Sequence, residues 1–110
     1  MIFAKINNTV IELEVADTIE KAKQGLSGRR SLGKNKGMLF TFPNLNPVIQ
    51  TKQMNFPLEL LFIDSNNKIT DIIYAPKSDD LFEGEGYYVI EVNKDFSKEN
   101  DVKINDKVMF

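Results

Sequence analysis

Short β-type runs separated by turn residues are the feature of this sequence that most restricts its fold. Runs of β-branched, aromatic and aliphatic residues recur along the chain, and Gly, Pro, Asn or Asp stands between them. Many short strands with frequent turns are typical of a small β-sandwich or β-barrel. The length of 110 residues predicts a single domain, residues 1–110. We expect strands at residues 2–6, 9–15, 38–42, 48–54, 58–63, 68–75 and 87–92, with one or two more within 102–110.

Two hairpins are the clearest local predictions. Asn7 and Asn8 tolerate the positive φ of a tight turn, and apolar residues then alternate with charged ones as far as Val15. Residues 64–67, Asp-Ser-Asn-Asn, are typical of a second turn, and they follow the most apolar run of the chain, residues 58–63.

One clear helix and one short helical turn are expected. Asp17 followed by Glu20 matches a capping box, and Gly25 would end that helix. Asp95 would begin a short helical turn that ends near Asn100. The first helix carries apolar residues at helical spacing, namely Ile19, Ala22 and Leu26.

The composition removes several classes of function. The sequence has no cysteine and no histidine, which excludes disulfides, thiolate zinc sites and the commonest general base. The formal net charge of −2 disfavours nucleic acid as a partner, because phosphate backbones select basic surfaces. No basic segment followed by an apolar one begins the chain, and no apolar run approaches the ~18 residues of a membrane helix. We expect a cytoplasmic protein without cofactor, metal or membrane partner, which is a monomer or a weak homodimer.

A basic loop follows the first predicted helix. Glycine lets a backbone approach a ligand closely, and arginine can hold a carboxylate or a phosphate through two hydrogen bonds. The loop, residues 27–37, is therefore a candidate surface for an anion. The alternatives are a solvated loop, or one that pairs with the acidic loop of residues 76–86. The basic residues are Arg29, Arg30, Lys34 and Lys36.

Carboxylates offer the other candidate chemistry. Glu59 interrupts an apolar run and Asp64 ends it, so they could act as an acid–base pair. If Glu59 faces inward it needs a cation, for which Arg29 or Arg30 is the natural candidate; the alternative is a solvent-facing Glu59. The acidic loop could hold a divalent cation weakly, although a solvated loop is favoured. Its carboxylates are Asp79, Asp80, Glu83 and Glu85.

Three segments together carry a family pattern. They are GLSGRRSLGKNKGMLFTF from Gly25, MNFPLELLFID from Met54 and YVIEVNKDFSKENDVKINDKV from Tyr88. In order and spacing they closely resemble the DUF192 family, also called UPF0127. The resemblance implies a compact β-sandwich or barrel with small helices, and no established activity. Its signature positions fall on Gly25, Leu26, Arg29, Leu32, Gly37, Met38, Phe40, Met54, Pro57, Asp64 and Glu91.

The chain departs from the family pattern in two places. Where many members carry F-W-M-K-N-T, residues 49–54 lack the Trp and are more similar to a variant with a His-Thr pair before Gly-Met. Thr51 and Met54 match that variant, while Gln50 replaces its His and Gln53 its Gly. Glu59 stands where members have Asp. A site built on the Trp or the His is altered here, which makes catalysis by this chain less expected.

We therefore expect a binding or interaction module that holds a small anionic ligand or a protein segment near Arg29, Thr51 and Met54. The alternative is a hydrolase-like or carbohydrate-active enzyme that uses Glu59 or Asp64 with Arg29. Arg29 should be at least half buried and hydrogen-bonded to backbone carbonyls or to a carboxylate. No catalytic residue is predicted, and the candidate binding residues are Arg29, Arg30, Met38, Phe40, Thr51, Met54, Glu59 and Asp64.

Overall fold

The computed structural model describes residues 1–41, 48–77, 81–84 and 86–110. It is mainly β with two short helices, which confirms the expected fold class. The elements in chain order are β1 (Ile2–Ile6), β2 (Thr9–Ala16), α1 (Ile19–Gln24), β3 (Lys36–Thr41), β4 (Val48–Gln50), β5 (Leu58–Ile63), β6 (Ile69–Ala75), β7 (Leu81–Glu83), β8 (Tyr88–Asn93), α2 (Phe96–Glu99) and β9 (Val108–Met109).

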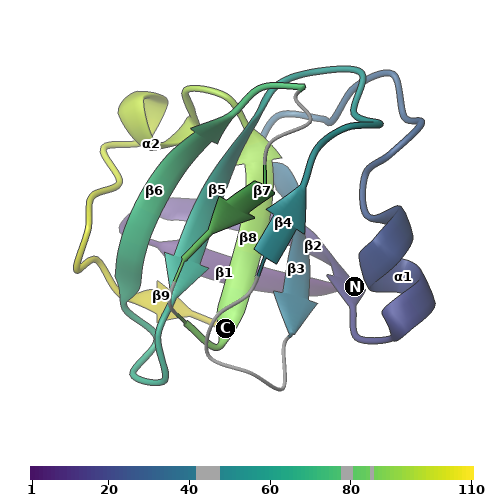
Figure 1. The fold of residues 1–110 in the computed structure, drawn as a ribbon. Helices are drawn as coiled ribbons and strands as arrows, with labels where there is room; N and C mark the ends of the chain where they lie inside the picture. The colour runs from purple at the N-terminus through teal and green to yellow at the C-terminus, as the bar shows by residue number, and fades with distance from the viewer. Residues whose placement is uncertain (42–47, 78–80, 85) are drawn as a thin grey trace.

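Seven of these strands form one sheet in the order β6-β5-β8-β3-β2-β1-β9. Its neighbours pair antiparallel except β2 and β3, which are parallel. A parallel pair needs a crossover connection, and the segment that contains α1 provides it. β4 and β7 form a separate antiparallel ribbon. In Figure 1 this ribbon lies in front of the sheet, and α1 lies at the right.

The large sheet curls until its two edge strands meet at one end. Lys68, just before β6, forms an antiparallel bridge with Lys107, just before β9. The Ile69 amide donates to the Asp106 carbonyl at 2.9 Å, and the Val108 amide donates to the Asn67 carbonyl at 2.7 Å. These bonds use backbone groups that an open sheet edge would leave unpaired. The result is a half-closed barrel, in agreement with the expected barrel-like architecture.

The middle strands are buried on both faces and so separate two apolar cores. Every residue of β5 is buried. Leu61 and Ile63 point into the curl of the sheet, where they join residues of β1, β2 and β9. Leu60 and Phe62 point to the outer face, where Leu26, Ile49 and Phe82 cover them. This second core lies between the sheet, α1 and the β4–β7 ribbon, and it borders the site described below.

Several local predictions were wrong at the boundaries. Thr18 rather than Asp17 caps α1, since its hydroxyl accepts from the Lys21 amide at 3.1 Å. Ile19 is 72% exposed instead of buried under the helix. The strand expected at 48–54 ends at Gln50, and β7 lies within a segment expected to be loop.

α2 begins without the cap expected from Asp95. That residue is in the left-handed conformation, with φ of 65°, and its side chain makes no capping hydrogen bond. A carboxylate from β5 supplies the cap instead, as described below. Within the described ranges, neither helix is long and apolar enough to span a membrane.

Candidate functional site

A pocket of about 960 Å³ opens between α1, the end of β3 and β4. Its lining combines apolar and polar side chains, and the apolar ones are Ile19, Ala22, Leu26, Phe40, Ile49 and Met54. Its polar lining includes Asp17, Lys23, Gln50 and Glu91. A concave surface that combines apolar side chains with polar groups is a common form of small-molecule site.

Glu91 is the polar group that sets this pocket apart from the rest of the core. Along β8, Ile90 and Val92 belong to the core inside the curl, so Glu91 points to the outer face. There it lies between Met38 of β3 and Leu60 of β5 in the strand register. Glu91 as a whole is only 4% exposed to solvent. Burial raises the pKa of the Glu91 carboxyl from 4.5 to about 8.

The Glu91 carboxyl has no protein partner among the residues that the structure describes. Neither a hydrogen bond nor an ion pair to it is found there. Because no fully buried side-chain oxygen lacks a partner in that part of the chain, the Glu91 oxygens reach the surface of the pocket. A buried carboxyl normally pairs with a cation or with hydrogen-bond donors, because water no longer stabilises its charge. The pocket is therefore the place from which a partner for Glu91 could come.

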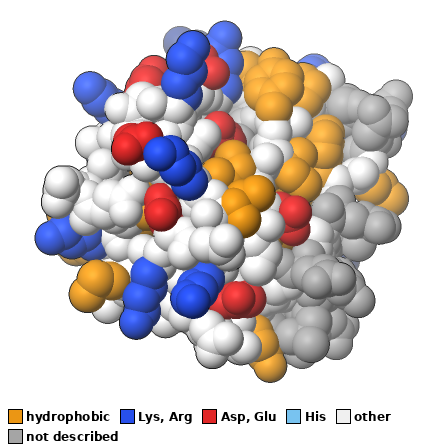
Figure 2. Space-filling model, turned by 90° about the vertical axis from the view of Figure 1, so that its left-hand side faces the viewer, with side chains coloured by type: hydrophobic (Ala, Val, Ile, Leu, Met, Phe, Trp, Pro, Cys, Tyr) orange, Lys and Arg blue, Asp and Glu red, His pale blue; other side chains and the backbone are white. Residues whose placement is uncertain are grey.

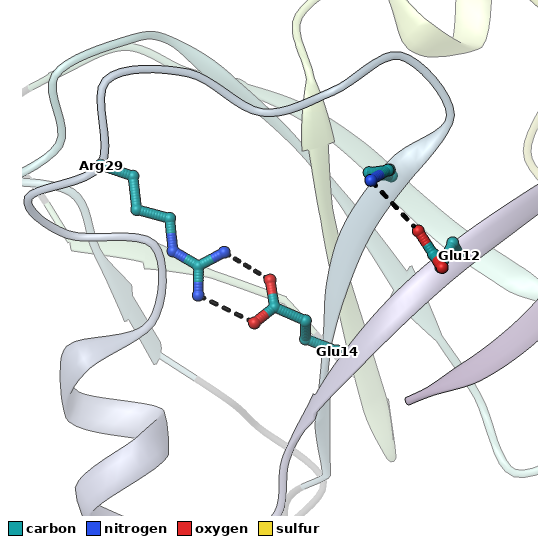
Figure 3. Close-up of polar contacts among 4 residues, drawn as sticks. Glu12, Glu14 and Arg29 are labelled. Carbon is teal, nitrogen blue, oxygen red and sulfur yellow. Dashed lines mark hydrogen bonds and ion pairs between the residues drawn. The ribbon is translucent and has the colours of Figure 1, made fainter.

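The basic loop is tied to β2 by an ion pair. The Arg29 guanidinium holds both oxygens of Glu14, with Nη2 to Oε1 at 2.9 Å and a second bond from Nη1 to Oε2 (Figure 3). The Arg29 side chain is 40% exposed, so the prediction that it is at least half buried and bonded to a carboxylate is confirmed. The hydrogen bond from Arg29 lowers the pKa of Glu14. Lys36 likewise lies 3.3 Å from Glu12, whereas Arg30 is exposed.

The Arg29–Glu14 pair should contribute about 1 kcal/mol of coupling energy to folding, because it is bidentate yet partly solvated. A double-mutant cycle with Arg29→Met and Glu14→Gln, followed by urea unfolding at low and high salt, measures this coupling. The Lys36–Glu12 pair is the matched control and should give less, since its lysine is 57% exposed. A coupling of zero for Arg29 and Glu14 at low salt would contradict the assignment.

Glu59 and Asp64 have structural partners of their own. The Glu59 carboxylate accepts from the Ser97 amide and the Ser97 hydroxyl, both at 2.8 Å, and so caps α2. Burial raises the pKa of Glu59, and the two bonds from Ser97 partly oppose that shift. Glu59 is 8% exposed, so the expectation of a solvent-facing Glu59 is wrong. The alternative of a pair with Arg29 or Arg30 is also wrong, because Ser97 binds Glu59 and Arg29 binds Glu14.

Asp64 closes the hairpin turn, where it accepts from the amides of Asn66 at 2.8 Å and Lys68 at 3.0 Å. It lies five positions after Glu59, a distance of about 16 Å along an extended strand. The two carboxylates therefore do not form a pair, and neither lines the pocket.

The remaining candidates divide between the pocket and the core. Phe40 and Met54 line the pocket, and Met38 lies beside Glu91 in the sheet. Thr51 is 1% exposed, and its hydroxyl donates to the Pro76 carbonyl at 2.7 Å, where it anchors the turn after β4. Of the eight predicted binding residues, the structure thus places Phe40 and Met54 at the pocket.

Glu91 was noted as a family position but not as a site residue. The available signal was a charged residue in the middle of the apolar strand YYVIEV. In the acidic loop, Asp79, Asp80 and Glu85 lie outside the described residues, as does the side chain of Glu83. Elsewhere in the described part, no three acidic side chains are grouped to hold a metal ion.

Comparison with known proteins gives a family and two similar structures. The family model DUF192, described as "Uncharacterized ACR", matches residues 2–110. A Sinorhizobium meliloti protein described as a "putative transcription regulator" is 29% identical, with a TM-score of 0.84 over 90% of this chain and 81% of that one. A Novosphingobium aromaticivorans protein of unknown function is 22% identical, with a TM-score of 0.92 over 99% of this chain and 84% of that one, which shows the fold alone. No curated protein matches the chain.

Proposed function

The chain belongs to the DUF192 family, and we propose that it is a non-catalytic binding module whose small ligand enters the pocket beside α1. One observation carries this proposal. Glu91 is buried where it borders that pocket, without a partner among the described residues. A hydrogen bond to a charged group contributes about 1.5–3 kcal/mol, and a ligand in the pocket could form one with the Glu91 carboxyl.

The proposed position of the ligand depends on where the predicted binding residues lie and on which of them already bind another residue. Arg29 is engaged by Glu14, and Thr51 is engaged by Pro76, so two of the three residues expected around an anion already have partners. Met54, the third, lines the pocket together with Phe40. We therefore propose that the ligand contacts Met54 and Phe40, and that Arg29 fixes the loop between α1 and β3.

Two other functions receive less support. An enzyme that uses Glu59 or Asp64 with Arg29 would need these groups to converge, whereas each holds a separate structural contact. The Sinorhizobium meliloti relative is described as a transcription regulator, but this chain has a net charge of −2. On the face shown in Figure 2, Lys and Arg side chains are interspersed with Asp and Glu, so its described residues form no basic patch for a phosphate backbone.

Filling the pocket should abolish binding of a small apolar probe. In an NMR titration of the ¹⁵N-labelled protein with hexan-1-ol, we expect saturable shifts at pocket residues such as Ala22 and Phe40. Ala22→Trp places a large side chain in the pocket and should remove these shifts. Lys98→Trp, on an exposed position of α2, is the matched control and should leave them unchanged. Equal shifts in both variants, or no saturable shifts in the parent, would overturn the proposal.

A further inference from the structure

We propose that the ligand of this pocket is a primary amine with an apolar body, and that its ammonium group pairs with the Glu91 carboxylate. The inference rests on the proposed function, since it names the ligand class of the same site. It follows from the charge of the pocket wall, the position of Glu91 and the side chains around it.

Glu91 lacks a hydrogen-bond donor or a cation beside its carboxyl within the described part of the chain. Its neighbours in the sheet, Met38 and Leu60, are apolar and offer no side-chain hydrogen bond. An ionised carboxylate in such surroundings is stabilised mainly by a cation that approaches closely. An ammonium group has three donors and a full positive charge, so it can satisfy both oxygens of the carboxylate.

The described residues of the pocket wall place no cation next to Glu91. The wall's only other charged side chains within the described part of the chain are Lys23 on α1 and Asp17 just before the helix. Lys23 is exposed, and Asp17 pairs with Lys21 at 3.5 Å on the outside of the helix. Once Glu91 is ionised, two carboxylates face one lysine, so the wall is acidic in that state and favours a cationic ligand over an anionic one.

The apolar side chains of the pocket suit the apolar part of the ligand. Leu26, Ile49 and Met54 line the same pocket as Glu91 and contribute aliphatic and thioether groups to it. Phe40 adds an aromatic ring, whose face also attracts an ammonium group. An alkyl chain can be buried against these side chains while its charged end reaches Glu91.

Three probes of equal length separate the possible ligand classes. Hexylamine, hexan-1-ol and hexanoate present the same chain with an ammonium, a hydroxyl or a carboxylate. At about pH 8, isothermal titration calorimetry should show hexylamine binding at least tenfold more tightly than hexan-1-ol, with hexanoate weakest. Between about pH 6 and pH 8 the affinity for hexylamine should rise severalfold, because the Glu91 proton must leave before the pair forms, while that for hexan-1-ol should change little.

Substitutions assign the effect to Glu91. Glu91→Gln keeps the shape of the side chain and should remove the preference for hexylamine over hexan-1-ol. Glu20→Gln, an exposed carboxylate on α1, is the matched control and should keep it. Lys23→Met should leave the affinity for hexylamine equal or increased, whereas a loss would show that Lys23 takes part in binding and would overturn the inference.

The outcomes separate this inference from the proposed function. If hexan-1-ol binds in the pocket as tightly as hexylamine, or if Glu91→Gln keeps the amine preference, the pocket remains a binding site but the amine inference is wrong. If none of the three probes binds there, both are wrong. The pH series needs only the unaltered protein, so it tests the inference even if Glu91→Gln does not fold.

Discussion

Glu91→Gln should raise the free energy of unfolding at high pH, by up to about 5 kcal/mol near pH 9. Near pH 4 the substitution should change the stability little. Burial raises the pKa of Glu91 from 4.5 to about 8, and each pKa unit corresponds to about 1.4 kcal/mol of folding free energy. Glutamine has nearly the same shape but never ionises. The substitution therefore removes the cost of a buried negative charge without leaving a cavity.

The sign follows from where the proton is held. The folded chain keeps the Glu91 proton up to about pH 8, whereas the unfolded chain loses it near pH 4.5. The free energy of unfolding contributed by Glu91 thus falls as the pH rises through this window and is constant above it. Urea unfolding of both proteins at about pH 4.5, 7 and 9 measures the difference, with Glu20→Gln as the exposed control. Parallel stability curves for the parent and Glu91→Gln would contradict the assignment.

Elements fixed by neighbouring residues could be predicted from the sequence. The Asn7 turn has the positive φ that its side chain tolerates, at 54°, and it joins β1 to β2 where the alternating pattern placed them. β5 spans Leu58–Ile63, which are also the bounds that its mainly apolar run predicts. In both places the signal lies within a few residues of the structure that it specifies.

Partners from distant parts of the chain could not be predicted in the same way. Glu59 and Glu91 each interrupt an apolar strand, so the local pattern treats them alike. Glu59 meets Ser97, 38 positions along the chain, and becomes a helix cap. Glu91 points to the opposite side of the sheet and meets a pocket. Which glutamate serves structure and which serves the site depends on how the sheet curls, and that is decided by all of its strands together.

The partner of Arg29 in the basic loop could not be predicted either, because it also comes from another strand. Four basic residues within residues 27–37 suggest an anion site as long as their partners are unknown. Glu14 lies on β2, and the parallel pairing of β2 with β3 brings it alongside the loop that connects them. Because Arg29 is already paired with Glu14, the carboxyl of Glu91 rather than the basic loop is the group to which we assign the proposed ligand.

Gly37→Ala should destabilise the protein by about 3 kcal/mol or more, through steric overlap between neighbouring strands. A Cβ atom at Gly37 would lie 2.5 Å from the backbone oxygen of Glu91, 3.1 Å from Val92 Cγ1 and 3.2 Å from Leu13 Cδ2. The first contact is with the backbone of β8, which cannot move away without disturbing its pairing with β3. Glycine is therefore required at position 37 because there is no space for a Cβ atom between the strands.

Gly33→Ala is the matched control in the same loop region. There the added Cβ would approach only the flexible side chain of Lys36, at 3.0 Å from Cδ, so the expected change is about 0.5 kcal/mol or less. Urea unfolding of the two variants measures the contrast, and a similar loss in both would contradict it. Because the overlap in Gly37→Ala falls on the backbone of Glu91, its amide NMR signal should also shift in the folded variant. The packing of β3 against β8 and the position of the pocket carboxyl would then depend on the same contact.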